Sequence, residues 1–137
     1  MQLGLSLGYW GAQPPTDLVP RVQEAEHLGY DAVWTAECWG SDAFSPLVFL
    51  AAHTERIRLG TGIGLVAQHD TLTFAKQIAT LDRISGGRFV LGIGFGWNAE
   101  EMEDHGTNYR RRWRLMRENI LAMKEIWTQE EAEFHGD

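Results

Sequence analysis

Four short segments of the chain carry the residue pattern of β-strands. In three of them a large apolar residue occupies every second position, and the positions between hold mainly glycine. Because successive side chains of a strand point to opposite faces, each of these three strands would have one bulky face and one face with little side-chain volume. The expected strands span residues 3–9, 31–37, 56–66 and 86–98.

The fourth segment, GGRFVLGIGFGWN, contains three glycines that stand two residues apart, Gly92, Gly94 and Gly96. A dinucleotide-binding turn needs the spacing G-x-G-x-x-G between a strand and a helix, so this segment does not predict such a turn. The spacing instead predicts that the three glycines share one face of a strand and leave room there for a ligand.

Apolar residues at helical spacing follow each expected strand and predict a helix after it. Thr16, Ser41 and Asn98 stand where a side chain commonly caps the first turn of a helix. The segments that hold these helices are residues 14–30, 41–55, 70–87 and 97–127.

The order of elements is βαβαβαβα, and helical crossovers of this kind connect parallel strands. In an open doubly wound sheet helices cover both faces, so both faces of the strands would be bulky. In a barrel the inner face points at the axis, where glycine leaves space for a ligand. The pattern therefore favours an α/β fold of the TIM-barrel type. Because a complete barrel needs eight βα units, residues 1–137 are expected to form one domain, a (βα)4 half-barrel with parallel strands.

Charge and composition argue against several classes of function. The net charge at pH 7 is -7, whereas a nucleic-acid-binding surface is basic. No apolar run approaches the roughly 20 residues of a membrane span, and the first residues lack the basic and apolar regions of a signal peptide. The single cysteine, Cys38, cannot form an internal disulfide. We therefore expect a cytoplasmic protein that binds neither nucleic acid nor membranes.

Five stretches together resemble the luciferase-like monooxygenase family, and most of all its branch that uses the deazaflavin coenzyme F420. They are LGLSLGYWGAQPP, GYDAVWTAE, AAHTERIRLGTGI, ATLDRISGGRFVLGIGFGWN and RRRWRLMRENILAMKEIWTQ. The combination of TERIRLGT with ATLDRISGGRF is more specific than any glycine motif. The resemblance implies a TIM-barrel oxidoreductase that uses coenzyme F420 or FMN for hydride transfer or for monooxygenation of a small organic substrate.

The resemblance also implies that the coenzyme ring lies at the C-terminal ends of the strands. Glu37 ends the second strand, where family members place an acidic residue beside the ring. His69 lies in the loop after the third strand, at the same end of the barrel, and is the histidine expected near substrate. These two residues are the candidates for catalysis. In the family the end of the third strand carries a cis peptide bond, and the matching pair is Gly62 and Ile63. The residues expected to contact the coenzyme are Gly62, Ile63, Gly94, Gly96, Trp97 and Asn98.

Simpler explanations stay open for several of these residues. Glu37 also fits a solvated carboxylate at a strand end, and Asn98 also fits a helix cap alone. Cys38 stands where some F420-dependent dehydrogenases of the family carry a catalytic histidine, which argues against sugar-phosphate chemistry, and it fits a small buried side chain. The basic run at residues 110–117 either binds phosphate or the acidic coenzyme tail, or forms a solvated helix face. The five histidines have no metal-ligand spacing, so no metal is expected.

Half a barrel would leave the first and fourth strands with unpaired backbone groups, and such edges pair readily with another strand. Two copies related by a two-fold axis, or a separate chain with the other half, would complete the eight strands. We therefore expect a homodimer or a partner chain that completes the barrel. An alternative of another class is a non-catalytic or truncated half-barrel that acts as an assembly module.

Overall fold

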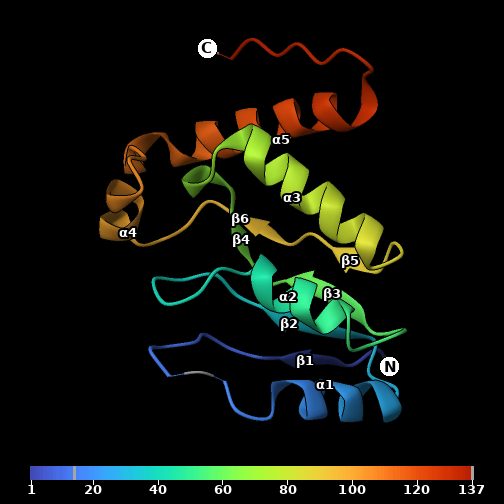
Figure 1. The fold of residues 1–137 in the computed structure, drawn as a ribbon. Coiled ribbons are helices and arrows are strands. Elements are labelled where there is room, and N and C mark those ends of the chain that lie inside the picture. Colours follow the sequence, from blue (N-terminus) through green and yellow to red (C-terminus); the bar gives the residue numbers. More distant parts are fainter. Residues whose placement is uncertain (14, 137) are drawn as a thin grey trace. The chain divides into compact units, whose positions relative to one another are not determined.

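The chain folds into two compact units. The computed structural model describes residues 1–13 and 15–136. The first unit holds Met1–Gly64 and Thr80–Gly92, and the second holds Leu65–Ala79 and the residues from Ile93 onward. Figure 1 labels the elements of both units along the chain.

The first unit contains a four-stranded parallel sheet. Its strands are β1 (Gly4–Ser6), β2 (Ala32–Thr35), β3 (Arg58–Thr61) and β5 (Phe89–Val90), in the spatial order β1-β2-β3-β5. Trp34 lies opposite Ser6 on one side and Gly60 on the other, and Leu59 lies opposite Phe89. All three pairings are parallel, which confirms the expected order and direction of the four strands.

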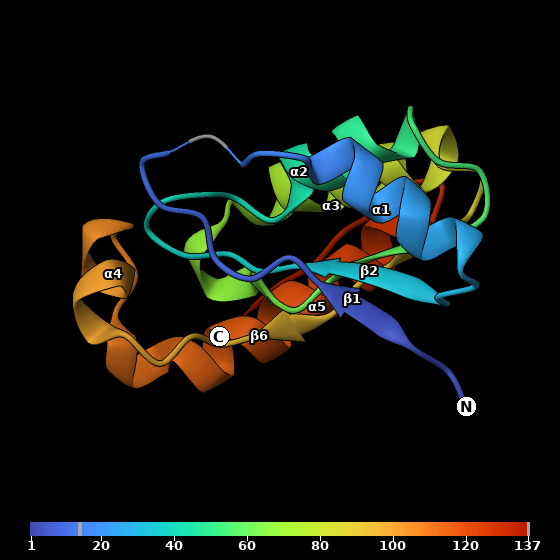
Figure 2. The same ribbon diagram turned by 90° about the horizontal axis from the view of Figure 1, so that it is seen from below.

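Two helices of the first unit, α1 (Leu18–His27) and α2 (Phe44–Ala51), lie on the same side of the sheet, as Figure 2 shows. The strands contribute fully buried side chains such as Val33 and Leu59 to the core. Because alternate strand residues point to the helix-covered face, these side chains pack with the apolar faces of the helices. The buried helix residues are Leu18, Val22 and Ala25 in α1, and Phe44, Pro46, Leu47 and Leu50 in α2.

Neither helix of the first unit starts at the expected cap. Asp17, not Thr16, occupies the N-cap position of α1, with a left-handed backbone (φ 56°) and no capping hydrogen bond from its side chain. Ala43, not Ser41, holds the N-cap position of α2, and the side chain that binds its first turn is that of Asp42. Asp42 Oδ1 accepts hydrogen bonds from the N–H of Phe44 at 2.8 Å and of the next residue at 2.7 Å. Neither N-cap residue makes a capping hydrogen bond with its own side chain, so a preference for capping residue types could not locate these helix starts.

The third and fourth expected strands are each divided in two. After β3 the chain forms β4 (Gly64–Leu65), and after β5 it forms β6 (Ile93–Gly94), which pairs with β4. At the division, Thr61 Oγ1 donates a hydrogen bond to Gly92 O at 2.7 Å and accepts one from Gly92 N–H at 2.9 Å. A regular ladder joins main-chain groups, so it is interrupted where a side-chain hydroxyl takes their place.

The second unit consists mainly of helices. They are η1 (Val66–Gln68), α3 (Thr71–Ile84), whose residues from Thr80 onward belong to the first unit, α4 (Ala99–Asp104), η2 (Tyr109–Arg111) and α5 (Arg112–Thr128). Side chains of α5 bind main-chain carbonyls of earlier elements: Asn119 Nδ2 donates to Val66 O at 3.2 Å, and Trp127 Nε1 donates to Ala75 O at 3.2 Å. None of the helices in the described residues combines the length and the apolar character needed to span a membrane.

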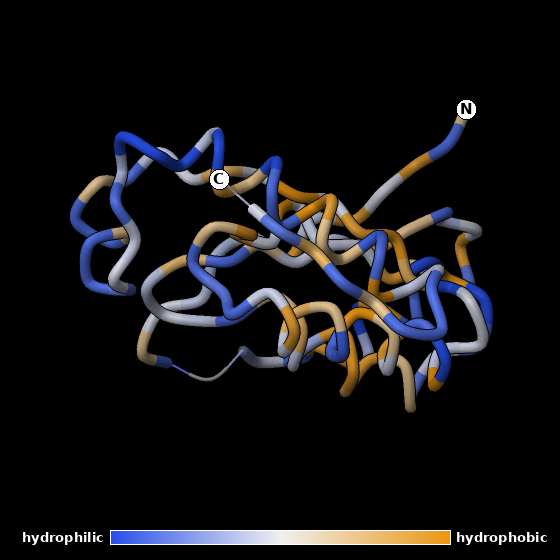
Figure 3. Tube along the Cα trace, turned by 90° about the horizontal axis from the view of Figure 1, so that it is seen from above, coloured by the Kyte–Doolittle hydropathy of each residue, from blue (hydrophilic) through white to orange (hydrophobic). Residues whose placement is uncertain are grey.

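The helical region expected over residues 97–127 is divided into α4, η2 and α5. Gly106 follows α4 with φ 76°, and Asn108 Oδ1 then accepts the Arg110 N–H at 3.0 Å and caps η2. The segment from α4 to η2 is predominantly hydrophilic, seen as blue tube at the left of Figure 3. Apolar periodicity therefore gave no signal for the break between the helices.

Candidate functional site

The C-terminal ends of β2 and β3 lie side by side in the first unit. Gly62 N–H donates to Thr35 O at 2.6 Å, and Glu37 N–H donates to Ile63 O at 3.2 Å. These bonds continue the pairing of the two strands beyond their regular ends. The structure thereby brings together three of the expected site residues, Glu37, Gly62 and Ile63.

The Gly62–Ile63 peptide bond is cis, as the family resemblance implied. Gly62 is exposed, whereas Ile63 and Glu37 are half-buried. A methyl group added to Gly62 would meet its nearest neighbours in the Trp34 side chain at 3.8 Å, an ordinary van der Waals distance. A methyl group would therefore fit at Gly62, which is exposed and lies beside a strand end that carries a carboxylate.

Two other glycines of the sheet do not face empty space, because Trp34 of β2 lies over both of them. A methyl group at Gly4 would lie 2.6 Å from Trp34 Nε1, and one at Gly60 would overlap the six-membered ring of the same indole. The expectation of a free strand face is wrong at these positions. The glycines of β1 and β3 make room for a ring of the protein itself, which fills the space as core side chains do.

The three glycines of the fourth expected strand do not share one flat face. A methyl group at Gly92 would overlap the carbonyl oxygen of Thr61, so close approach of two backbones requires glycine there. Gly96 is buried and has φ 78°, a left-handed conformation that favours glycine. Gly94 is half-buried in β6. The expectation that the three glycines share one ligand-binding face is therefore wrong. Coenzyme contacts of Gly94 and Gly96 stay predictions.

Three further candidates belong to the second unit. His69 is half-buried, and its ring stacks on Phe74 with a centroid distance of 4.5 Å. Trp97 is 81% exposed. Asn98 Oδ1 accepts the N–H of Glu100 at 3.1 Å, which confirms the capping role of Asn98 at α4. Roles of these three residues in binding coenzyme or substrate stay predictions.

His69 also lines an open pocket of about 430 Å³ in the second unit. Thr107 Oγ1 donates to Ala67 O at 2.6 Å and so holds the loop after α4 against η1. No motif predicted a ligand site in this loop, since its polar residues have no spacing typical of one. The lining includes His69, Asp70, Thr107, Asn108, Arg111 and Asn119.

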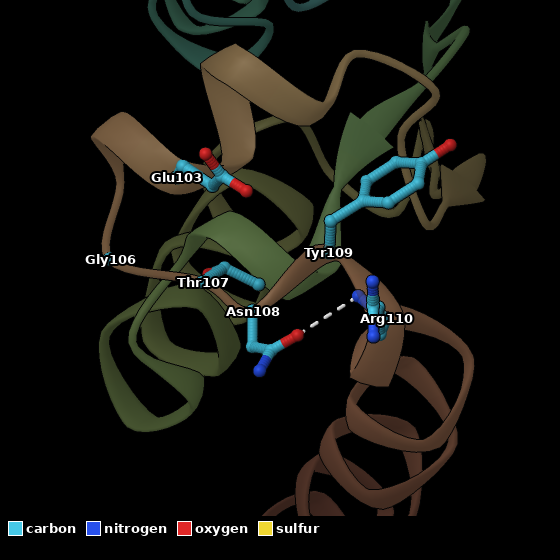
Figure 4. A pocket seen from close by; sticks show the side chains of 6 residues that line it. All are labelled: Glu103, Gly106, Thr107, Asn108, Tyr109 and Arg110. Atoms are coloured by element: carbon cyan, nitrogen blue, oxygen red, sulfur yellow. Dashed lines mark hydrogen bonds between the residues drawn. The ribbon is translucent and has the colours of Figure 1, made fainter.

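A second open pocket, of about 610 Å³, shares Gly106, Thr107 and Asn108 with the first, and Figure 4 shows its lining. The dashed line in Figure 4 is the bond that Asn108 Oδ1 accepts from the main chain of Arg110, so this oxygen is engaged in capping. The charged lining residues of the two pockets are of both signs and all exposed: Asp70, Glu103, Arg110 and Arg111. Neither pocket therefore selects a ligand by charge.

Asp70 precedes α3 and accepts the Thr73 N–H at 2.8 Å. Hydrogen bonds from the main chain and the hydroxyl of Thr73 hold the pKa of Asp70 below its ordinary value. The carboxylate is therefore ionised at neutral pH. It occupies the positive end of the α3 dipole, where it disfavours a second anion such as a phosphate group.

The basic run at residues 110–117 takes part in contacts within the chain. Arg114 pairs with Glu118 one turn further along α5, at 2.8 Å, and the guanidinium carbon of Arg112 lies 3.9 Å from the ring centre of Tyr109. Such contacts support the interpretation as a solvated helix face. Cys38 is a half-buried free thiol, and no three or more metal-ligating side chains cluster within the described parts of the chain.

Comparison with known proteins decides the family. Residues 3–137 match the family described as luciferase-like monooxygenase. The chain belongs to the luciferase-like monooxygenase family. The resemblance read from the sequence motifs is confirmed.

Relatives of this luciferase-like chain are longer than it is. A protein of Mycobacterium tuberculosis, whose name proposes a coenzyme F420-dependent oxidoreductase, is 40% identical over 130 residues, which cover 95% of this chain and 38% of the relative. The oxygenating constituent of 3,6-diketocamphane monooxygenase from Pseudomonas putida, solved in complex with FMN, superposes with a TM-score of 0.83 at 20% identity. The coenzyme F420-dependent tetrahydromethanopterin reductase of Methanopyrus kandleri superposes with a TM-score of 0.66 at 26% identity.

The two superpositions cover 100% and 98% of the luciferase-like chain, but only 43% and 35% of the solved chains. The chain thus spans less than half the length of each of these three proteins. The likeness confirms the expected α/β fold of the TIM-barrel type, with parallel strands that form part of a barrel.

Proposed function

We propose that this chain binds the reactive ring of coenzyme F420 at the C-terminal ends of β2 and β3, as part of an oxidoreductase that acts on a small organic substrate. The observation that carries the proposal is the pairing of Glu37 with the Gly62–Ile63 segment through the 3.2 Å bond from Glu37 N–H to Ile63 O. Barrel enzymes place their active-site groups at this end of the strands. An exposed glycine and a carboxylate on neighbouring strand ends supply a flat contact surface and a polar partner close together.

Each of the three residues has a separate task in this proposal. Coenzyme F420, when bound, supplies the hydride chemistry, and the protein supplies position and electrostatics. Gly62 admits the face of the ring because it has no side chain, and Ile63 adds apolar contact. The Glu37 carboxylate accepts a hydrogen bond from an N–H of the ring edge or from a substrate hydroxyl. A proton that leaves this hydroxyl would be taken up by the same carboxylate.

The names of two relatives favour coenzyme F420 over FMN. The Mycobacterium tuberculosis protein, at 40% identity, and the Methanopyrus kandleri reductase, at 26%, both carry F420 in their names. FMN is the alternative, with monooxygenation as the reaction, because an FMN-bound monooxygenase shares the fold. At 20% identity this likeness concerns the scaffold, and a shared scaffold does not imply a shared coenzyme.

Further strands are needed to close the sheet into a barrel. Among the described residues, β1 pairs only with β2, and β5 is an edge beside β3. We propose that a second copy in a homodimer, or a partner chain, covers these edges, because exposed strand edges pair readily. We place the protein in the cytoplasm, where a single free thiol such as Cys38 stays reduced. The rival proposal is a non-catalytic assembly module with the same edges.

Gel filtration of the purified chain with coenzyme F420, and in parallel with FMN, tests the proposal. We expect F420 absorbance to elute with the protein. Gly62→Leu should weaken F420 affinity at least about tenfold in a fluorescence titration, because the leucine side chain would occupy the space of the ring. An unchanged melting temperature would show that this variant keeps the fold. If neither coenzyme elutes with the protein, the assembly module is favoured instead.

A further inference from the structure

The loops after β1 and β2 are in contact on the C-terminal side of the sheet in the first unit. The described parts of these loops are residues 7–13, 15–17 and 36–43. A methyl group at Gly40 would overlap the carbonyl oxygen of Trp10, so the two backbones touch. In Figures 1 and 2 both loops extend to the same side, at the left of each view. Glu37 belongs to the second loop, so the two loops form one surface beside the proposed site.

Three aromatic residues belong to this surface, which we call the aromatic wall: Tyr9, Trp10 and Trp39. Tyr9 is 68% exposed and Trp39 is 60% exposed, whereas Trp10 is half-buried. Large rings in exposed loops leave apolar surface in contact with water. A bound ligand would cover this surface, which favours binding. Tyrosine and tryptophan also bind with little loss of conformational entropy, because their side chains are rigid. The aromatic wall therefore has the composition of a binding surface for apolar rings.

The two loops that form the aromatic wall carry charge of one sign. Neither loop contains lysine or arginine, whereas the two loops contain Asp17, Glu37 and Asp42. The arginines nearest in the sheet stand at the opposite ends of the strands, where Arg58 begins β3 and Arg88 directly precedes β5. An anionic ligand at the aromatic wall would lose hydration and find no cation within the two loops to replace it. Arg21, in the first turn of α1, is the basic residue that follows the first loop. A phosphate or carboxylate group is thus disfavoured there.

We propose that the aromatic wall binds the ring system of a neutral organic substrate and discriminates against phosphorylated and carboxylated ones. This inference rests on the proposed function, since it names the substrate class of the same site. The ring of the substrate packs against Tyr9 and Trp39. Glu37, in the same loop as Trp39, then receives a hydrogen bond from a hydroxyl group of the substrate.

A matched pair of probes tests the inference: 2-naphthol and 2-naphthyl phosphate, which differ only in the phosphate ester. Titration calorimetry of the purified chain should show binding of 2-naphthol, with 2-naphthyl phosphate at least about tenfold weaker because its charge is left unpaired. Trp39→Ala and Tyr9→Ala should each weaken 2-naphthol binding about three- to tenfold, as expected for loss of one aromatic contact. Phe49→Ala is the matched control, because Phe49 is an aromatic residue of α2 that is 50% exposed.

The results distinguish failure of the aromatic-wall inference from failure of the proposed coenzyme binding. The inference is overturned if 2-naphthol does not bind, if the phosphate binds as tightly, or if Phe49→Ala has the same effect as Trp39→Ala. Co-elution of coenzyme F420 is measured on the same preparations. Coenzyme binding without discrimination between the probes means that the inference alone fails. Discrimination that depends on Trp39, without any coenzyme binding, supports the aromatic wall and contradicts the proposed function alone.

Discussion

Thr61 and Gly92 exchange two hydrogen bonds through a single hydroxyl group. The hydroxyl of Thr61 donates to the carbonyl of Gly92 at 2.7 Å and accepts from its N–H at 2.9 Å. Thr61 is completely buried, and Gly92 is half-buried. The same threonine directly precedes Gly62 in the chain. The pair therefore fixes the end of β3 at the point where the proposed coenzyme site begins.

Replacing Thr61 by valine should reduce the free energy of unfolding by about 1–3 kcal/mol, because the N–H of the half-buried Gly92 loses its hydroxyl partner. The carbonyl of Gly92 keeps a second bond, from Gly64 N–H at 2.9 Å. Urea unfolding of the purified variant measures the change. Thr61→Ser is the control, since it keeps the hydroxyl and removes only a methyl group. Wild-type stability of Thr61→Val would contradict the structural role of this contact.

Gly92→Ala and Gly62→Ala form a matched pair that compares a glycine in close backbone contact with a glycine at which a methyl group would fit. The added methyl group overlaps the Thr61 carbonyl in the first variant and meets nothing nearer than 3.8 Å in the second. We expect Gly92→Ala to reduce the free energy of unfolding by about 1–3 kcal/mol, as overpacking does. Gly62→Ala should change it by less than about 0.5 kcal/mol. Similar losses in both variants, measured by urea unfolding, would speak against this difference between the two glycines.

The arrangement of elements could be predicted from the sequence because it depends on local patterns. Alternating apolar residues indicate strands, and apolar residues at helical spacing indicate a helix between each pair of strands. Helical crossovers of this kind connect parallel strands. Parallel strands in sequential order bring their C-terminal ends to one edge. The proximity of Glu37 to the Gly62–Ile63 segment therefore followed from the order of elements alone, and the structure has this contact.

The use of the glycines could not be predicted, because it depends on side chains from neighbouring strands. Gly4 and Gly60 belong to different strands, and only the register places both beside Trp34. Alternation in one strand shows which positions lack side chains but does not show what fills the space. The contact between Thr61 and Gly92 could not be predicted either, because a hydroxyl group that replaces main-chain pairing leaves no periodic pattern in the sequence.

A double-mutant cycle tests whether Trp34 fills the space in front of Gly60. Gly60→Ala alone should be destabilising, because the new methyl group overlaps the indole. In the background of Trp34→Ala the same methyl group meets no ring, so Gly60→Ala should be nearly neutral there. We expect a coupling free energy of about 1–3 kcal/mol from urea unfolding of the four proteins. Additive effects would show that the two side chains do not compete for one space.

Glu26 binds the chain that leads into β3. Its Oε1 atom accepts hydrogen bonds from the N–H groups of Glu55 at 3.0 Å, Arg56 at 2.6 Å and Ile57 at 2.7 Å. Burial is the largest single influence on the pKa of Glu26 and raises it, but the hydrogen bonds from Ile57, Arg56 and Glu55 together outweigh it. The pKa of Glu26 is therefore held below the ordinary value of 4.5.

A lowered pKa in the folded state means that the ionised form of Glu26 stabilises the fold. This stability is fully present above the pKa of the unfolded chain and is lost as the pH falls through the lower pKa of the folded state. We expect the free energy of unfolding of the wild type to exceed that of Glu26→Gln at neutral pH, and the difference to shrink below about pH 4. Urea unfolding at several pH values measures it, and Glu24→Gln, at an exposed position of the same helix, is the control. A difference that stays constant down to about pH 3 would show that the charge of Glu26 contributes nothing.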